Sequence, residues 1–294
     1  MINDQDPSQS NPPIVLGASG RIGTGFQRLA LAGHWPGPVP LWQARPGAAL
    51  VSDTRVDWDM LTAAPPDIGR LHGVICLAGA VSGDMTVNTN LALAAIDLAR
   101  TTGSGPVLLT STAAVYGPSD SAVTERADCL PTAAYGRAKL AMETAVSARL
   151  HDLGDRAPKV CILRIGNVAG ADALLLAAAR GVVTLDQFED RQGPERSYIG
   201  MLGLAQVMVR LITRFSGAGQ VPPILNVAAP QPVRMVALLQ AAGLTWDWKP
   251  APATALRRMV LDTALLDSLI LPDPACAEPA ELIRQSRLAG WVAA

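Results

Sequence analysis

Short apolar segments alternate along the chain with longer segments that have a helical repeat. The apolar segments contain no regularly alternating polar positions, as expected for strands buried on both faces of a parallel sheet, and they cover residues 13–18, 39–42, 73–77, 107–109 and 160–163. The longer segments repeat apolar side chains three and four residues apart, at residues 21–32, 85–100 and 132–150. This alternation predicts an α/β fold built on a doubly wound parallel sheet.

The regular alternation weakens after about residue 166. Residues 171–180 and 200–214 have helical spacing and residues 224–227 resemble a strand, but proline-rich connections separate them. We therefore expect three parts: a disordered polar tail at residues 1–12, an NAD(P)-binding Rossmann domain at 13–166, and a small substrate-binding lobe at 167–294 that is interleaved with the last strands of the sheet.

Composition and charge exclude several classes of function. The 294 residues are 49% apolar, and the formal net charge of −1 comes with scattered arginines, so no basic segment is suited to nucleic acid or an anionic membrane. No apolar segment is long enough to span a bilayer, and the polar start lacks a signal-peptide core. The four cysteines and three histidines have no metal-ligand spacing. We expect a cytoplasmic protein with reduced thiols and no metal.

Three glycines follow the first predicted strand and lead into the first predicted helix. Gly17, Gly20 and Gly23 let the backbone approach a pyrophosphate, and the helix start offers free N–H groups. This pattern predicts a dinucleotide site in a Rossmann fold, although a glycine-rich turn can also serve only to pack a helix on a strand. The residues expected to contact the cofactor here are Gly17, Ser19, Gly20, Arg21, Ile22 and Gly23.

The end of the second predicted strand bears on the choice between NAD and NADP. Residues 41–45 lack the acidic residue that usually binds the adenosine ribose of NAD, whereas Arg45, together with Arg21, could neutralise the 2′-phosphate of NADP. We therefore favour NADP over NAD, with a solvated surface charge as the alternative interpretation of Arg45. Asp57 could accept a hydrogen bond from the adenine amino group or be an exposed carboxylate.

Candidate catalytic groups lie in the middle of the chain. Tyr135 and Lys139 are four residues apart, so both project from one face of the predicted helix. An ammonium near a phenol lowers its pKa from about 10, which favours proton exchange with a carbonyl or an alcohol. Ser111 and Thr112 follow a buried strand, where a hydroxyl could hold a substrate oxygen beside the tyrosine.

Together these residues resemble the extended short-chain dehydrogenase/reductase family, the NAD-dependent epimerase/dehydratase family, which includes the NAD(P)-dependent sugar epimerases and dehydratases. The resemblance extends from about residue 14 to residue 229. It also rests on four further motifs: Leu77-Ala78-Gly79, which is expected to contact the cofactor, Asn90 at the start of a helix, Leu163-Arg164-x-x-Asn167-Val168, and Arg196-Ser197-Tyr198-Ile199.

The resemblance implies a role for each matching residue. Tyr135 would be the general acid/base, and Lys139 would both tune its pKa and bind the nicotinamide ribose. Thr112 occupies the Ser/Thr position of the family. Asn167 would face the substrate, and Arg196 would contact a substrate diphosphate. Hydride would then pass between the nicotinamide and a substrate carbon.

Departures from the family pattern narrow the range of reactions that the protein could catalyse. Ala113 and Ala114 stand where the sugar dehydratases carry an acidic pair, which disfavours dehydration. Simple oxidoreduction and epimerisation at one carbon both remain candidate reactions. The segment between Asn167 and Arg196 is shorter than in sugar-nucleotide enzymes of the family, so the substrate could be a nucleotide sugar or a smaller hydroxy or carbonyl compound. The alternative is a non-catalytic NAD(P)-binding sensor or assembly protein.

The resemblance also implies a homodimer. In the family, two helices, here residues 85–100 and 132–150, pair with their copies around a two-fold axis. Two stripes of side chains are available for this contact: Leu91, Ala95, Leu98 and Ala99 on the first helix, and Leu140, Ala141, Thr144, Ala145 and Ala148 on the second. Part of these stripes could instead belong to the core of the monomer.

Overall fold

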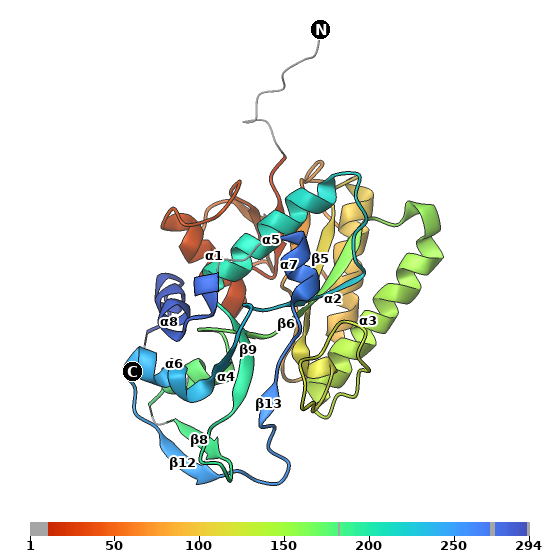
Figure 1. The fold of residues 1–294 in the computed structure, drawn as a ribbon. Coiled ribbons are helices and arrows are strands. Elements are labelled where there is room, and N and C mark those ends of the chain that lie inside the picture. Colours follow the sequence, from red (N-terminus) through yellow and green to blue (C-terminus); the bar gives the residue numbers. More distant parts are fainter. Residues whose placement is uncertain (1–10, 182, 271–273, 293–294) are drawn as a thin grey trace.

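The computed structural model describes residues 11–181, 183–270 and 274–292. Most of the tail predicted at residues 1–12 lies outside the described residues. Seven parallel strands form the central sheet, in the order β10-β6-β5-β4-β1-β2-β3 (Figure 1). They are β1 (Ile14–Leu16), β2 (Leu41–Ala44), β3 (Arg55–Asp57), β4 (Val74–Cys76), β5 (Val107–Thr112), β6 (Val160–Ile165) and β10 (Ile224–Val227).

The order of the strands indicates where a sheet of this kind binds its ligands. Successive strands extend to one side from β1 to β3 and to the other side from β4 to β10. In register, Ile14 of β1 pairs with Leu41 of β2 and with Val74 of β4. The order therefore reverses between β1 and β4, and α/β sheets bind ligands at the carboxyl ends of strands beside such a reversal. The predicted doubly wound parallel sheet is confirmed.

Helices cover both faces of the sheet. On one face, Val15 and Ile75 belong to a core cluster that α1 and α5 complete. On the other face, Leu16 and Cys76 pack into a second cluster with α2 and α3. Because neighbouring strand residues point to opposite faces, both faces must be apolar, and this explains the uninterrupted apolar strands. The four helices are α1 (Arg21–Leu31), α2 (Val87–Thr101), α3 (Ala134–Leu153) and α5 (Met201–Ser216).

A smaller lobe lies beside the carboxyl ends of the central strands (Figure 1). Strand β9 pairs with β7, β11 and β13, and a separate two-stranded sheet joins β8 to β12. The strands are β7 (Asn167–Val168), β8 (Thr184–Gln187), β9 (Glu195–Ile199), β11 (Pro232–Arg234), β12 (Asp247–Pro250) and β13 (Arg258–Met259). The helices are α4 (Ala173–Ala178), α6 (Met235–Ala242), α7 (Ala264–Leu269) and α8 (Pro279–Leu288), and the short 3₁₀ turns of the chain are η2 (Ala113–Val115), η3 (Gly154–Arg156) and η4 (Pro274–Ala277).

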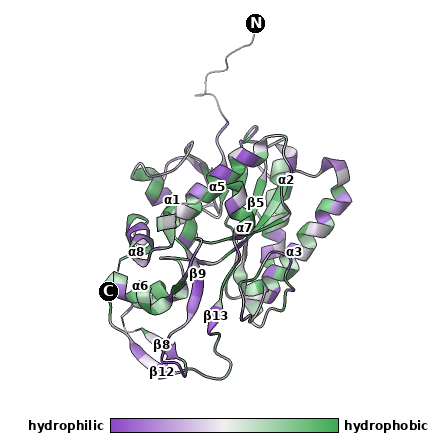
Figure 2. Cartoon of the chain, viewed as in Figure 1, coloured by the Kyte–Doolittle hydropathy of each residue, from purple (hydrophilic) through white to green (hydrophobic). Residues whose placement is uncertain are grey.

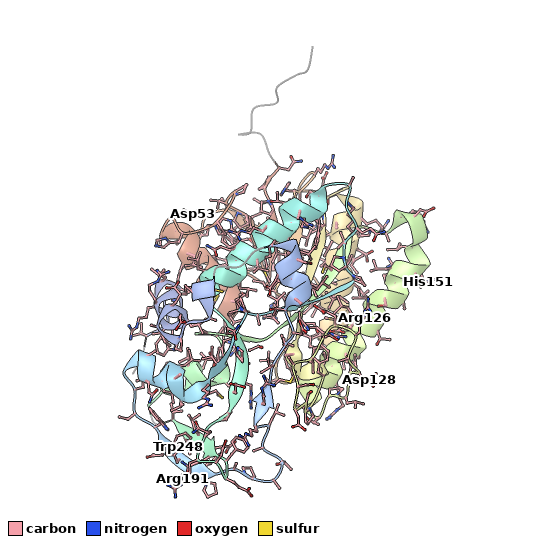
Figure 3. All side chains as sticks on the ribbon, viewed as in Figure 1. Asp53, Arg126, Asp128, His151, Arg191 and Trp248 are labelled. Carbon is pink, nitrogen blue, oxygen red and sulfur yellow. The ribbon has the colours of Figure 1, made fainter. Side chains whose placement is uncertain are left out.

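Hydropathy differs between the two parts of the molecule. Figure 2 shows apolar residues concentrated in the central strands and on the helices that cover them, whereas β8 and β12 are largely hydrophilic. Trp248 and Arg191 lie at the end of the smaller lobe, far from α1 and α5 (Figure 3). Within the described residues, no helix combines the length and the apolar character needed to cross a membrane.

Candidate active site

The glycine-rich turn between β1 and α1 has the geometry of a phosphate cradle. Gly17 has φ +80°, and a Cβ there would lie 2.6 Å from backbone atoms of Ala78. A Cβ on Gly23 would lie 2.6 Å from the carbonyl oxygen of Ala18. Gly20 precedes α1, and no side chain caps the helix start. Close backbone approach therefore requires glycine at positions 17 and 23, and the uncapped start of the helix can accept a pyrophosphate.

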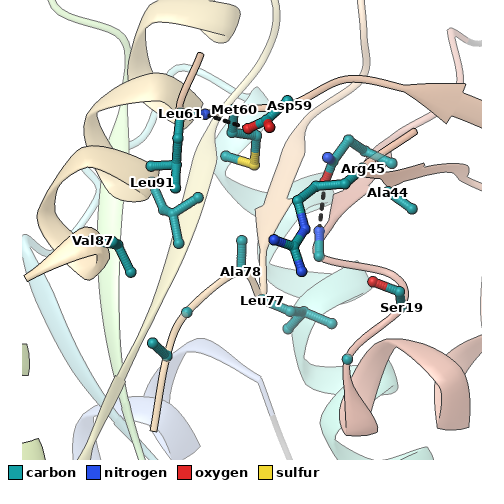
Figure 4. Close-up of a pocket in the computed structure, with 15 residues that line it drawn as sticks. Ser19, Ala44, Arg45, Asp59, Met60, Leu61, Leu77, Ala78, Val87 and Leu91 are labelled. Atoms are coloured by element: carbon teal, nitrogen blue, oxygen red, sulfur yellow. Dashed lines mark hydrogen bonds between the residues drawn. The ribbon is translucent and has the colours of Figure 1, made fainter. Parts of the chain in front are cut away.

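One end of this cradle opens into a cavity of about 370 Å³ (Figure 4). Arg45 follows β2 directly and lines this cavity, as do Ser19 and Ala78. Asp57 does not line it. Its carboxylate pairs with Arg55 at 2.5 Å in the adjoining hollow, and the hydrogen bond from Arg55 lowers the pKa of Asp57.

Asp59, which sequence reasoning missed, is the acidic side chain that lines the cavity. It projects beside Met60 and Leu61 in Figure 4 and accepts a hydrogen bond from the Leu61 N–H at 3.0 Å. The short strand β3 ends at Asp57, and the chain then turns, so the position two residues later reaches the cavity. A strand of three residues offers too little periodicity to locate its end from sequence.

An asparagine holds the segment that follows β4. Asn88 is buried; its Oδ1 accepts from the Ala80 N–H at 2.8 Å, and its Nδ2 donates to the Ala80 carbonyl at 3.0 Å. Asn90, the asparagine singled out from the sequence, is exposed on α2. Asn90 lies in the first turn of α2, as expected, but because the helix begins at Val87 it is Asn88 that turns toward the sheet.

A second cavity, of about 560 Å³, adjoins the cradle at the carboxyl ends of β5 and β6. We refer to it as the catalytic cleft. It brings together residues from α1, β5, α3 and the smaller lobe. The sequence-predicted residues that line it are Gly17, Ser19, Gly20, Arg21, Ile22, Gly23, Leu77, Gly79, Ser111, Thr112, Tyr135, Lys139 and Asn167.

Tyr135 and Lys139 enter the cleft from the first turns of α3. Lys139 is only 3% exposed, and its Nζ donates to the carbonyl of Thr110 at 2.8 Å. Burial lowers the pKa of Lys139 and raises the pKa of Tyr135. Arg21 opposes this rise at Tyr135. The ammonium of Lys139 is directed at a β5 carbonyl, and its predicted effect on the pKa of Tyr135 stays a prediction.

The two neighbouring hydroxyls at the end of β5 have different surroundings. Ser111 is buried and bonds to the carboxylate of Glu143 at 2.5 Å. Thr112 is half-buried, and its Oγ1 accepts from the Ala114 N–H at 3.2 Å. The Thr112 hydroxyl can therefore donate its proton into the cleft, while Ser111 is committed to the protein interior.

Asp172 is a cleft residue that sequence reasoning missed. Its carboxylate caps α4 by accepting from the N–H groups of Leu174 at 2.9 Å and Leu175 at 3.3 Å. Burial raises the pKa of Asp172 to about 6, and the side chain lies in the same cleft wall as Asn167. An aspartate directly before an apolar helical segment is a recognised start signal for a helix, and this signal could have drawn attention to it.

Two arginines lie elsewhere than expected. Arg196 does not line the cleft; its guanidinium donates to the carbonyls of Glu195 at 2.8 Å, Leu256 at 2.5 Å and Arg257 at 3.1 Å. Arg21 does not line the cavity that contains Arg45. It lines the catalytic cleft instead and donates to the Ala171 carbonyl at 2.8 Å, which joins the glycine turn to the smaller lobe.

The chemistry that the cleft could support is therefore proton exchange beside a turn suited to a dinucleotide. Tyr135 supplies a phenol, Thr112 a hydroxyl and Lys139 an ammonium, all next to the phosphate cradle. Within the part of the chain that the structure describes, no group of three or more His, Cys, Asp or Glu side chains could hold a metal ion.

Comparisons with known proteins agree with this geometry. The chain superimposes on a UDP-glucose 4-epimerase from Brucella ovis in complex with NAD (TM-score 0.74, 21% identity, 97% of this chain and 100% of that chain). It also superimposes on a UDP-glucose 4-epimerase from Stenotrophomonas maltophila with bound NAD and formylated UDP-arabinopyranose (0.75, 17%, 95% and 98%). A third match is an NAD-dependent NDP-hexosamine 5,6-dehydratase of tunicamycin biosynthesis (0.75, 21%, 95% and 97%).

At these identities the structural matches show the fold, and the family assignment rests on the sequence. A comparison with curated proteins found no match. The family model for the NAD dependent epimerase/dehydratase family matches residues 14–185, which include the phosphate cradle, Tyr135 and Lys139. The chain belongs to the NAD-dependent epimerase/dehydratase family.

Proposed function

We propose that this protein is an NAD(P)-dependent oxidoreductase or epimerase that transfers hydride between the nicotinamide and a hydroxyl- or carbonyl-bearing carbon. The observation that carries the proposal is the single cleft in which Tyr135, Lys139 and Thr112 adjoin the phosphate cradle. A sensor or assembly protein needs the cradle alone, and nothing in cofactor binding requires a phenol and a hydroxyl beside it.

Different residues would bind the cofactor, transfer the proton and hold the substrate oxygen. The glycine turn and residues 77–79 would hold the dinucleotide, which supplies the hydride chemistry. Tyr135 gives a proton to the substrate oxygen or removes one from it, and Thr112 holds that oxygen by a hydrogen bond. Lys139, fixed by Thr110, provides positive charge beside the reacting groups.

Dehydration is not part of the proposal. Ala113 and Ala114 form the η2 turn directly after Thr112 and carry no acid or base that could remove water across a carbon–carbon bond. Some proteins with this fold are dehydratases, so dehydration should be assayed alongside oxidation and epimerisation.

The class of substrate is proposed as a nucleotide sugar or a smaller hydroxy or carbonyl compound. Similar folds bind UDP-linked sugars, which supports the first. The guanidinium of Arg196, which was expected to bind a substrate diphosphate, already donates hydrogen bonds to three backbone carbonyls. This leaves a smaller hydroxy or carbonyl compound open as the substrate. For the cofactor, we propose NADP over NAD because Arg45 lines the cavity at the far end of the cradle.

The test combines substrate screening with one substitution. Purified protein is incubated with each nicotinamide cofactor and a panel of nucleotide sugars and small carbonyl compounds, and products are followed by nicotinamide absorbance and NMR. Tyr135→Phe should lower turnover by about 10²-fold or more, the usual contribution of a positioned acid/base, with cofactor affinity unchanged. Full activity of Tyr135→Phe would refute the mechanism, and cofactor binding without any turnover would favour a sensor.

A further inference from the structure

A buried ion pair lies directly behind the catalytic residues. Glu143 of α3 and Arg164 of β6 have side chains that are 5% and 4% exposed. Arg164 Nη2 lies 2.6 Å from Glu143 Oε2, and its Nε lies 3.2 Å from both carboxylate oxygens. Such a pair is tightly held, and removing one partner would leave a buried charge without compensation.

The carboxylate of this pair is attached to both catalytic elements. Glu143 comes one helical turn after Lys139 and lies on the same face of α3. Its Oε1 accepts a hydrogen bond from Ser111 at 2.5 Å. Ser111 stands between Thr110, whose carbonyl accepts from the Lys139 ammonium, and the cleft residue Thr112. One carboxylate therefore fixes the alignment of α3 with the end of β5.

The arginine continues the network toward the smaller lobe. Its guanidinium stacks over the ring of Tyr116 at 4.7 Å from the ring centre. The Tyr116 hydroxyl donates to Oδ1 of Asn226 at 2.7 Å, and Nδ2 of Asn226 donates to the carbonyl of Asp262 at 3.0 Å. The network thus connects the catalytic helix to the chain segment that precedes α7.

Stability alone does not account for such a pair. Replacing a buried ion pair by apolar groups of similar size is often neutral or stabilising, because the cost of desolvating both charges offsets their attraction. The position of the pair points to electrostatics instead. Burial disfavours the charged form of Lys139, and Cys76 together with the negative charge of Glu143 acts in the opposite direction.

We propose that Glu143, paired with Arg164, is a positioning residue of the reaction: it aligns α3 with β5 through Ser111 and keeps the buried Lys139 ammonium protonated. This proposal rests on the proposed function for its catalytic meaning, but the charge on Lys139 can be measured without any substrate. The titratable groups that bear on the pair and on Lys139 are Cys76 from β4, Tyr116 and Glu125 near Arg164, and Cys129 from the segment before α3.

The experiment titrates Lys139 directly. The chain has only three lysines, so side-chain ¹³C NMR of lysine labelled at Cε gives three signals, and Lys139→Arg identifies the one from Lys139. In Glu143→Gln, which keeps a hydrogen-bond acceptor for Ser111 but removes the charge, the Lys139 midpoint should fall by about one pH unit or more. With an identified substrate, the high-pH limit of kcat should fall in parallel.

Two controls keep the test decisive. Asp97→Asn breaks the half-buried ion pair between Asp97 of α2 and Arg149 of α3, at 2.9 Å, and it should leave the Lys139 midpoint unchanged. Should Glu143→Gln fail to fold, the double variant Glu143→Leu/Arg164→Met is titrated in its place, and a smaller fall of the Lys139 midpoint is expected because the positive charge of Arg164 is lost as well. An unaltered Lys139 midpoint in a folded charge-removing variant would overturn the proposal. Absence of turnover in the parent protein would refute only the proposed function.

Discussion

Burial favours the neutral form of three side chains in the cleft, Tyr135, Lys139 and Asp172. It raises the pKa of Tyr135, lowers that of Lys139 and raises that of Asp172. Neighbouring groups oppose these changes: Arg21 at Tyr135, and Cys76 followed by Glu143 at Lys139. The net rise at Tyr135 favours the neutral phenol, which is the form that can give a proton to a carbonyl oxygen.

Asp172 gives a prediction about stability and pH. Its pKa is about 6 in the folded chain against an ordinary value of 3.8, so the folded state binds more protons and stability falls as pH rises from about 4 to about 6. Asp172→Asn retains a good helix cap without the buried charge. We expect it to be about 1–3 kcal/mol more stable than the parent at about pH 8 and equal to it near pH 4.

Chemical denaturation at the two pH values measures this difference, and Asp172→Ala is the matched control. Alanine loses the cap, at a cost of about 1 kcal/mol, so Asp172→Ala should be less stable than Asp172→Asn at both pH values. A gap between the parent and Asp172→Asn that does not change with pH would show that the fold does not raise the pKa of Asp172.

Arg45 gives a prediction about cofactor choice. A charge-assisted bond to a 2′-phosphate contributes about 1.5–3 kcal/mol, roughly tenfold to a hundredfold in affinity. We therefore expect NADPH to bind more tightly than NADH, and Arg45→Ala to remove the difference in calorimetric titrations. Arg70, an exposed arginine outside both cavities, is the control position, and Arg70→Ala should keep the preference. Equal affinities in the parent protein would reduce Arg45 to a surface charge.

Residues whose role depends on local spacing could be predicted from the sequence, and residues whose role depends on distant partners could not. Tyr135 and Lys139 share a helix face, so their spacing was enough to bring both into the cleft. Arg196 matches a family motif, but carbonyls some sixty residues later take up its guanidinium. The residues near Arg196 in the sequence do not indicate that these carbonyls lie beside its guanidinium.

At the scale of elements, long buried segments were easier to predict than short ones. The helix expected at residues 132–150 is α3 (Ala134–Leu153), and the strand expected at 224–227 is β10 over the same residues. Strands β7 and β13 have two residues each, too few for any periodicity, and are defined by their pairing with β9. The smaller lobe is therefore specified by contacts between segments far apart in the chain.

Close packing of α3 on the η2 turn gives a prediction at this scale. A Cβ on Gly136, the residue after Tyr135, would collide with the carbonyl oxygen of Ala114. Gly136→Ala should therefore displace α3 from the end of β5, destabilise the protein by about 1–3 kcal/mol and lower cofactor-dependent turnover. Thermal unfolding measures the first effect and a steady-state assay the second.

Gly203 in α5 is the matched control, because a Cβ there would meet its nearest neighbour at 3.5 Å, an ordinary van der Waals distance. Gly203→Ala should be neutral or stabilising by up to about 1 kcal/mol through helix propensity. If Gly136→Ala behaved in the same way, the η2 turn would be able to move, and close packing would not fix the position of Tyr135.

At the scale of the whole molecule, the two parts of the chain complete each other. Strand β10 and helix α5 come from beyond residue 166, yet β10 pairs with β6 and α5 covers one face of the central sheet. Arg21 reaches the Ala171 carbonyl, and Arg28 reaches the Gly290 carbonyl at 3.1 Å. The division at residue 166, which remains a prediction, would leave an edge strand and a sheet face uncovered in an isolated first part.

The predicted homodimer can now be placed on a smaller surface. Ala95, Leu98 and Ala99 are buried in the monomer core, so only the other stripe residues remain for a partner, among them the exposed Ala141 and Ala148 on α3. Small side chains permit close approach of helices around a two-fold axis. We expect a dimer in sedimentation at micromolar concentration, disrupted by Ala141→Glu but not by Ala253→Glu on the smaller lobe, whereas a species of 30.7 kDa in the parent would contradict it.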